Sequence, residues 1–349
     1  MIKVLVVDDS PVVREFLVHI LGSDPHIEVI GTATNGEKAV EATQRLRPDV
    51  ITMDIHMPGM DGIEATRRIM ETCPVPIVVV SGSSDPREVA TTFRAMEAGA
   101  VAVLRRPVGI GHPDHEAMAM DLVQMVKAMA EVKVVRRWPR RNGDSTAAPA
   151  VETRMERGPA RVRIIAIGAS TGGPPVLQGI LAALPKDLPA PIVIVQHMAA
   201  GFTQGFVQWL AQSSSLPVHL AMHGEHVRPG HVYVAPDEFH MKVERGETVV
   251  LRKDEPEHGL RPSVSYLFRS VRETYGGDVV AGLLTGMGRD GADELRLLKD
   301  KGALTFVQDK DSCVVHGMPG EGIRLDAATL VLTPQKIAAM LAHLANNGK

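Results

Sequence analysis

The stretch IIAIGASTGGPP, residues 164–175, runs from an apolar segment into a turn of small residues and ends in two prolines. Within it, GASTG matches the pattern G-x-S-x-G, in which a sharp strand-to-helix turn exposes a serine oxygen near backbone N–H groups. A phosphate cradle would need a lysine after the glycines, whereas Pro174 and Pro175 remove two amide donors. The pattern therefore favours Ser170 as a nucleophile, with a plain glycine-rich turn as the remaining alternative.

A nucleophilic serine needs a base and an acid that orients the base, and two later strand ends offer them. PIVIVQHM, residues 191–198, places His197 after a second apolar run, and Asp290 follows a third, DVVAGLL, at 278–284. Functional groups of parallel α/β sheets gather at the carboxyl ends of the strands. The three segments therefore predict a Ser170, His197, Asp290 triad.

The third segment also supports a rival interpretation. Gly286, Gly288 and Gly291 spell G-x-G-x-x-G after a strand and before a helix, with Asp309 and Asp311 about 20 residues on. This is a dinucleotide-binding pattern. It is disfavoured because such a pattern normally opens a nucleotide domain, and here it follows strands that already carry a serine and a histidine.

The chain divides into two α/β regions separated by an arginine- and proline-rich connector. Short β-branched runs alternate with helical stretches over residues 1–131, and again over 162–349, with a linker at 132–161. This alternation predicts parallel sheets covered by helices on both faces. The first region is expected to be a five-stranded, flavodoxin-like sheet, and the second a doubly wound, mainly parallel one. A hairpin is expected between residues 231–235 and 248–252.

Carboxylates follow two strands of the first region. Asp8 and Asp9 come after the first strand and Asp54 after the third, and these strands are neighbours in a flavodoxin-like order. Crowded carboxylates raise one another's pKa unless a cation compensates, and an all-oxygen cluster suits Mg²⁺. The alternative is a simple helix start, with Ser10 as cap and Pro11 in the first turn.

Composition excludes several classes of protein. The 349 residues carry a formal charge of −3, which gives no general attraction to nucleic acid or to an anionic membrane. Cys73 and Cys313 are the only cysteines, and neither lies in a C-x-x-C pair, so a reducing compartment fits best. The N-terminus has no signal-like apolar region, and no run is long enough to span a membrane. We expect a cytoplasmic protein without direct membrane insertion and without a nucleic-acid partner.

The first region resembles a response-regulator receiver domain, on the motifs VVDDS, MDIHMPGMDG, VVVSGSS and RRP. The resemblance implies that Asp54 accepts a phosphoryl group from a chemotaxis histidine kinase of the CheA type. It also implies Mg²⁺ on Asp9, Asp54 and the backbone carbonyl of His56, with Asp8 close by and Ser81 on the phosphoryl oxygens. Arg106 stands where the family has a lysine, and Val103 where many receivers carry an aromatic switch residue.

The second region resembles the chemotaxis protein-glutamate methylesterases of the CheB family, on the motifs IGASTGGP, VQHM, YVAPDEFHM, RPSVSYLF, LLTGMGRDGA and GMPGEGI. The resemblance implies a catalytic triad of Ser170, His197 and Asp290, in that chain order. It implies hydrolysis of glutamate γ-methyl esters, and deamidation of selected glutamines, on the cytoplasmic helices of methyl-accepting chemoreceptors. Backbone N–H groups of Thr171 and Met287 are the candidate oxyanion donors, and no cofactor is expected in this region.

Some residues depart from the family pattern or suggest other chemistry. Ser265 stands where an aspartate is common, and Asp293 and Glu294 stand where small residues are usual. Four histidines could suggest a metal site, but their spacing favours solvated or hydrogen-bonded side chains; they are His223, His226, His231 and His240. The non-enzyme alternative is a binding module with an inactive esterase region, gated by phosphorylation.

Overall fold

The computed structural model of the chain describes residues 1–82, 85–132, 134 and 161–347. The chain forms two compact units, Met1–Thr146 and Ala147–Lys349, and each is described here by itself. Nearly all of the expected linker lies outside the described residues. The domain boundaries at 131 and 162 therefore remain predictions.

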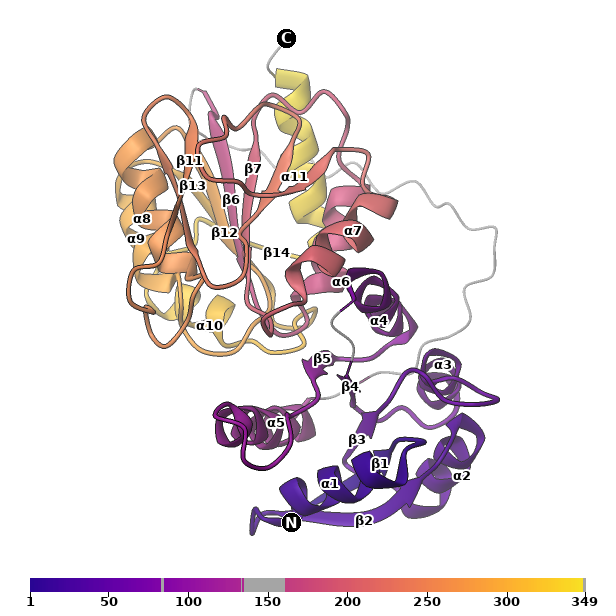
Figure 1. The fold of residues 1–349 in the computed structure, drawn as a ribbon. Helices are drawn as coiled ribbons and strands as arrows, with labels where there is room; N and C mark the ends of the chain where they lie inside the picture. Colours follow the sequence, from indigo (N-terminus) through magenta and orange to yellow (C-terminus); the bar gives the residue numbers. More distant parts are fainter. Residues whose placement is uncertain (83–84, 133, 135–160, 348–349) are drawn as a thin grey trace. The chain divides into compact units, whose positions relative to one another are not determined.

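The N-terminal unit is a parallel sheet of order β2-β1-β3-β4-β5, as predicted (Figure 1). Helices α1 and α5 pack against each other, and α2, α3 and α4 pack in a row. A buried core fills the space around the strands. The strands are β1 (Ile2–Val7), β2 (Ile27–Ala33), β3 (Val50–Met53), β4 (Ile77–Ser81) and β5 (Ala102–Arg105). The helices are α1 (Pro11–Gly22), α2 (Gly36–Leu46), α3 (Gly62–Thr72), α4 (Pro86–Ala98) and α5 (His115–Ala130).

The C-terminal unit contains a second parallel sheet, of order β14-β13-β12-β6-β7-β9-β8. Its strands are β6 (Ile164–Ala169), β7 (Ile192–Gln196), β8 (Val218–Leu220), β9 (Val232–Val234), β12 (Val279–Leu283), β13 (Leu304–Gln308) and β14 (Leu330–Leu332). Its helices are α6 (Gly173–Ala182), α7 (Thr203–Ser213), α8 (Val264–Tyr275), α9 (Ala292–Asp300), α10 (Met318–Arg324) and α11 (Pro334–Asn347). This is the predicted doubly wound α/β fold.

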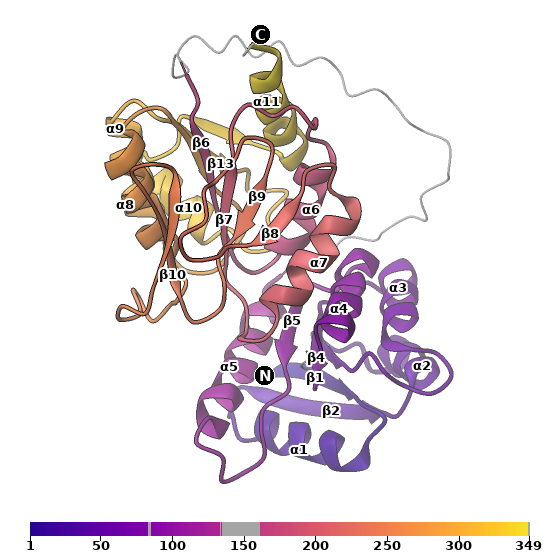
Figure 2. The same cartoon turned by 45° about the horizontal axis from the view of Figure 1, so that its top comes forward.

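The order of the strands decides where a site can form. The chain enters the sheet at β6, builds outward through β7 on one side, and later returns through β12 on the other side of β6. Helices α8 and α9 cover one face, and α6, α7 and α11 cover the other (Figures 1 and 2). The strand order therefore reverses between β6 and β12. Open α/β sheets bind ligands outside the carboxyl ends of the strands at such a point.

The expected hairpin forms with a different first strand. Residues 232–234 belong to β9 in the parallel sheet, and the antiparallel partner of β11 (Thr248–Arg252) is β10 (His240–Glu244). The prediction was wrong because residues 240–244 lie much closer to β11 along the chain, across a turn that contains Gly246 at φ +87°. Val232, Tyr233 and Val234 are buried, as in a central parallel strand.

None of the helices in the described ranges is long and apolar enough to cross a bilayer.

Candidate functional site

Ser170 lies directly after β6, at the point where the chain turns into α6. Its backbone N–H donates to the carbonyl of Thr285, 3.0 Å away, beyond the end of β12. The turn continues through Gly172, whose φ of +77° lies in the left-handed region that a side chain would disfavour. The glycine thus allows α6 to start at Gly173 and leaves Ser170 on the rim of the sheet.

His197 lies beside Ser170 because β6 and β7 are paired in parallel register. Ala169 pairs with Gln196, and the N–H of His197 donates to the carbonyl of Ala169 at 2.9 Å. Ser170 is the next residue after β6, and His197 is the next residue after β7. Their backbones therefore lie about one inter-strand spacing apart. The structure brings the predicted pair together at the edge of the sheet.

His197 contacts the third predicted residue directly. Its Nε2 lies 3.0 Å from Oδ2 of Asp290, and only 9% of the histidine side chain and 2% of the aspartate side chain are exposed. Since Nε2 faces the carboxylate, Nδ1 is the ring nitrogen left for the serine. Ser170 Oγ itself makes no hydrogen bond to the residues that the structure describes. Nucleophile–base hydrogen bonds often tighten only when substrate binds.

Asp290 is held as an anion by the start of α8. It accepts hydrogen bonds from Ser263 Oγ at 2.9 Å, from the N–H of Val264 at 2.6 Å and from the N–H of Ser265 at 3.0 Å. Burial alone would raise the pKa of Asp290, but hydrogen bonds from His197 and Ser265 and the histidine charge lower it below its ordinary value. A charged carboxylate fixes the His197 tautomer with the proton on Nε2.

Gln196 is a positioning residue that the sequence did not reveal. Its buried side-chain amide donates to the carbonyls of Ser170 and His197, both at 2.8 Å. One amide therefore joins the backbones of the expected nucleophile and base. A glutamine at the end of an apolar strand gave a weak signal, but nothing in the sequence indicated which backbone groups it would bind.

The sequence also did not reveal that Ser263 and His240 support Asp290. His240 is buried, accepts from the N–H of Ser263 at 3.3 Å, and lies 3.0 Å from the carbonyl of Glu255 through its Nε2. Ser263 is the N-cap of α8 and supplies one of the donors to Asp290. A capping serine is recognisable in sequence, whereas its distance of 27 residues from Asp290 hides the contact.

The loop after β12 packs tightly against the serine. A Cβ added to Gly286 would lie 2.6 Å from the Cβ of Ser170 and 2.6 Å from the sulfur of Met318, so only glycine fits. Thr285 Oγ1 donates to the carbonyl of Thr171 at 2.9 Å. The backbone N–H groups of Thr171 and Met287, the candidate oxyanion donors, make no hydrogen bond within the described parts of the chain. The close packing of Gly286 against Ser170 explains why this position of the G-x-G-x-x-G pattern is a glycine.

The departures from the family pattern have partners in this chain. Ser265 Oγ accepts from the N–H of Gly291 at 2.9 Å, and Glu294 pairs with Arg269 at 3.1 Å and Arg272 at 3.0 Å, joining α9 to α8. Asp293 pairs with Arg289 on the surface. The four histidines each have a hydrogen-bond partner, as expected.

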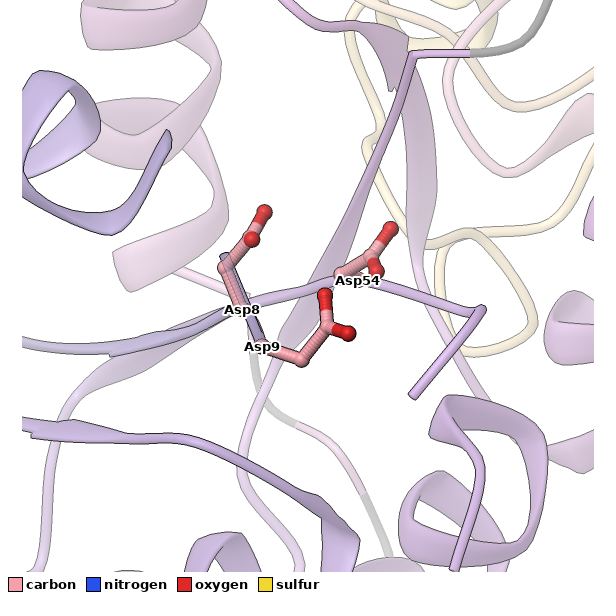
Figure 3. A group of neighbouring side chains, drawn as sticks. All are labelled: Asp8, Asp9 and Asp54. Atoms are coloured by element: carbon pink, nitrogen blue, oxygen red, sulfur yellow. The ribbon is translucent and has the colours of Figure 1, made fainter. Parts of the chain in front are cut away.

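The predicted carboxylates of the N-terminal unit do converge (Figure 3). One oxygen atom from each of Asp8, Asp9 and Asp54 lies within 4.8 Å of the others, at the ends of β1 and β3. Asp8 Oδ1 accepts from the N–H of Ser10 at 2.9 Å, while its buried Oδ2 has no partner in the described residues. An unpartnered buried carboxylate oxygen in an all-oxygen cluster fits a hard divalent cation such as Mg²⁺.

Electrostatics support the same interpretation. Burial, and then the charge of Asp54, raise the pKa of Asp8 to about 6, and burial also raises the pKa of Asp54. Arg106 opposes both shifts. A bound cation would remove the cost of keeping these carboxylates ionised together.

The other expected receiver residues lie on β4, on or directly after β5, and in the loop after β3. Ser81 ends β4 and is buried, and its carbonyl accepts from the N–H of Arg106 at 2.8 Å. His56 is exposed two residues after Asp54, and Val103 is a half-buried residue of β5. Ser81 at the end of β4 and Arg106 directly after β5 thus lie at the same edge of the sheet as the carboxylates, whereas Val103 lies within β5.

The fold and the two sites define an α/β protein in which a receiver-like unit is joined to a unit with a serine, a histidine and an aspartate at its sheet edge. A model of the CheB methylesterase family matches residues 165–341, and a model of the response regulator receiver domain matches residues 4–112. The chain belongs to the CheB methylesterase family and carries a receiver domain.

The names of two relatives that match over nearly the whole chain agree with this family assignment. The chain is 65% identical over 344 residues to a protein of Nitrosospira multiformis named protein-glutamate methylesterase/protein-glutamine glutaminase, covering 99% of this chain and 97% of that protein. It is 59% identical over 346 residues to a protein of Geobacter metallireducens with the same name and the number 4, covering 99% of each. The crystal structure of the Thermotoga maritima CheB methylesterase catalytic domain aligns with a TM-score of 0.51 at 40% identity, covering 52% of this chain and 98% of that one.

Proposed function

We propose that this enzyme hydrolyses glutamate γ-methyl esters on methyl-accepting chemoreceptors and deamidates selected receptor glutamines, under control of phosphorylation at Asp54. The observation that carries the catalytic part is the His197–Asp290 pair at 3.0 Å, placed beside Ser170 by the parallel register of β6 and β7. The binding-module alternative has no observation in its favour.

In the proposed reaction, Ser170 Oγ attacks the γ-carbonyl carbon while His197 Nδ1 takes its proton. Asp290 holds the imidazole through Nε2 and stabilises the imidazolium that forms. His197 then returns the proton to the leaving methoxide, methanol departs, and a glutamyl ester on Ser170 remains. Water, activated by the same histidine, hydrolyses that ester and frees the glutamate.

Two tetrahedral oxyanions form along this path, and the N–H groups of Thr171 and Met287 are the proposed donors. They follow the neighbouring strands β6 and β12, and the contact of Thr285 with the Thr171 carbonyl fixes one of the two turns. Each such donor contributes on the order of 10²–10³ in rate. Glutamine deamidation uses the same acyl intermediate, with ammonia leaving in place of methanol.

Receiver domains in general are phosphorylated with Mg²⁺. In this chain Asp9, Asp54 and the carbonyl of His56 are proposed to hold the ion, with Asp8 next to them. The ion would neutralise charge as the phosphoryl group moves. An Asp54 carboxylate oxygen attacks the phosphorus atom of a phosphohistidine on a chemotaxis kinase, the P–N bond breaks, and the kinase histidine leaves as Asp54 becomes an acyl phosphate. Ser81 and Arg106 bind the phosphoryl oxygens. The phosphorylated receiver then relieves inhibition of the esterase unit, a shift between two states.

The deciding experiment measures methanol release from a methylated receptor fragment. Ser170→Ala should abolish release, whereas Ser213→Ala, at an exposed serine that ends α7, should leave it unchanged. Adding Mg²⁺ and a small phosphodonor should raise release by the wild type and not by Asp54→Ala. Full activity of Ser170→Ala would refute the catalytic assignment, and no response to phosphodonor would refute the regulatory one.

A further inference from the structure

Gly82 lies next to Arg106 across two neighbouring strands. Ser81 at the end of β4 pairs with Arg105 at the end of β5, and the N–H of Arg106 donates to the Ser81 carbonyl at 2.8 Å. Gly82 therefore directly follows β4, and Arg106 directly follows β5. The structure places these two at the same edge of the sheet as the carboxylate cluster.

The Arg106 guanidinium occupies the space that a side chain at residue 82 would fill. A Cβ added to Gly82 would lie 2.6 Å from Cζ of Arg106 and closer still to Nη2, and real Cβ atoms do not approach so closely. The backbone of Gly82 has no positive φ that would require glycine. A side chain at 82 would therefore displace the Arg106 guanidinium, and the turn itself does not require glycine.

Arginine and lysine make different demands on this space. A guanidinium is a broad planar fork with several donors, whereas an ammonium is a compact point charge. The fork can bind two oxygens at once, which suits a phosphoryl group or adjacent carboxylates. Arg106 already acts electrostatically on both Asp8 and Asp54, so its charge is directed at the cluster.

We propose that Gly82 is the positioning residue that allows an arginine to serve as the phosphoryl-binding cation of this receiver. The missing side chain at 82 provides the room that the guanidinium occupies at the edge of the sheet where the carboxylates lie. An alanine there displaces the flexible end of Arg106 without disturbing the backbone, so the fold survives and the cation is misplaced. The inference rests on the proposed phosphorylation of Asp54.

The test is a double-mutant cycle in the full chain, made of wild type, Gly82→Ala, Arg106→Lys and the double variant. The first readout is the rate of phosphorylation by acetyl phosphate with Mg²⁺. Gly82→Ala should slow it about tenfold or more when residue 106 is arginine, because a misplacement of about 1 Å is costly. With lysine at 106 the same change should cost less than about twofold.

The second readout is the urea midpoint of the receiver transition at pH 8 without Mg²⁺, which needs no phosphorylation. Gly82→Ala should lower this midpoint with arginine at 106 and leave it unchanged with lysine, since only the guanidinium is displaced and its charge opposes the repulsion among the carboxylates. If wild type is not phosphorylated, the proposed function fails and the urea pattern still decides this inference. Equal effects of Gly82→Ala in both backgrounds would overturn it.

Two matched controls separate this effect from general ones. Gly109→Ala adds a methyl group at an exposed loop glycine with nothing within 4 Å, and Arg105→Lys changes the exposed neighbouring arginine. Neither should alter the phosphorylation rate or the urea midpoint. A loss in Gly109→Ala equal to that in Gly82→Ala would show that the space beside Arg106 has no special role.

Discussion

Asp290 is a buried carboxylate whose charge sets the protonation of the neighbouring His197. It lies at the edge of the sheet with 2% of its surface exposed, yet hydrogen bonds from Ser263, Val264, Ser265 and His197 surround its two oxygens. Those donors outweigh the cost of burial and keep the carboxylate charged. The charge, in turn, keeps the proton of His197 on Nε2.

Replacing Asp290 by asparagine should therefore lower kcat for methanol release by about 10⁴. The amide can present a donor to Nε2, which would favour the wrong histidine tautomer. Asp293→Asn is the matched control, because Asp293 is exposed and pairs only with Arg289 among the described residues. Its kcat should equal that of the wild type, and a small effect of Asp290→Asn would contradict the proposed role.

Asp8 should make the Mg²⁺-free receiver lose stability as pH rises. Its pKa is raised from 3.8 to about 6, so between these values the folded state keeps a proton that the unfolded state has released. Stability therefore falls through this window and stays lower above it. The full cost is roughly 2–3 kcal/mol at 1.36 kcal/mol for each pH unit.

Asp8→Asn removes that titration and tests the sign. Urea unfolding in the presence of a chelator should give similar stability for both proteins at pH 4, and a more stable Asn variant at pH 8. Saturating Mg²⁺ should remove the advantage of the variant, since the ion compensates the wild-type carboxylate. A variant that is no more stable than wild type at pH 8 would show that Asp8 ionises there without cost.

At the scale of elements, the N-terminus of α8 is a preformed binding site for a carboxylate. The N-cap Ser263 and the next two N–H groups all point at Asp290, and helix N-termini favour negative charge. His240, from β10, fixes the turn by accepting from the Ser263 N–H. The hairpin and the helix together position Asp290, the proposed third member of the triad, which belongs to neither element.

His240→Phe should therefore lower kcat and leave KM nearly unchanged. The phenyl ring fills similar space but cannot accept from Ser263, so the donors to Asp290 lose their alignment; we expect a loss of about tenfold, equivalent to one moderate hydrogen bond. His226→Phe is the control, because His226 is also hydrogen-bonded but lies on an exposed part of the unit. A change in KM alone would indicate that His240 acts on substrate binding.

At the scale of the whole molecule, each unit has its own buried core and its own sheet. The carboxylate cluster lies wholly in the N-terminal unit and the Ser170 site wholly in the C-terminal one. A ligand that binds a folded unit raises that unit's unfolding temperature by mass action. The two sites should therefore report on separate transitions.

Calorimetry of the full chain should show two transitions, and Mg²⁺ should raise only one of them. The shift should disappear in Asp9→Asn, which removes a proposed Mg²⁺ ligand, and persist in Ser170→Ala. Equal shifts of both transitions with Mg²⁺ would mean either that the units unfold together or that the ion binds elsewhere. Glu37→Gln, at an acidic residue outside the cluster, provides the control.

The sequence by itself determined the two parallel sheets, the helices that cover them and the residues that end their central strands, but not the hairpin strand at 240–244. Hydrophobic runs alternating with amphipathic stretches determine the fold class because each face of a parallel sheet must be covered. Once the strands are parallel, their carboxyl ends share an edge. Ser170, His197 and Asp290, like Asp8, Asp9 and Asp54, could be expected together for this reason alone.

Only the tertiary structure decided which side chains support those residues. The partner of β11, the amide of Gln196 on two carbonyls, the turn at Ser263 on Asp290 and the space that Gly82 leaves for Arg106 are all contacts between specific atoms. Such contacts depend on side-chain direction and on packing to within an ångström. Local sequence patterns fix the period of an element, whereas the distance between two elements is fixed by everything packed between and around them.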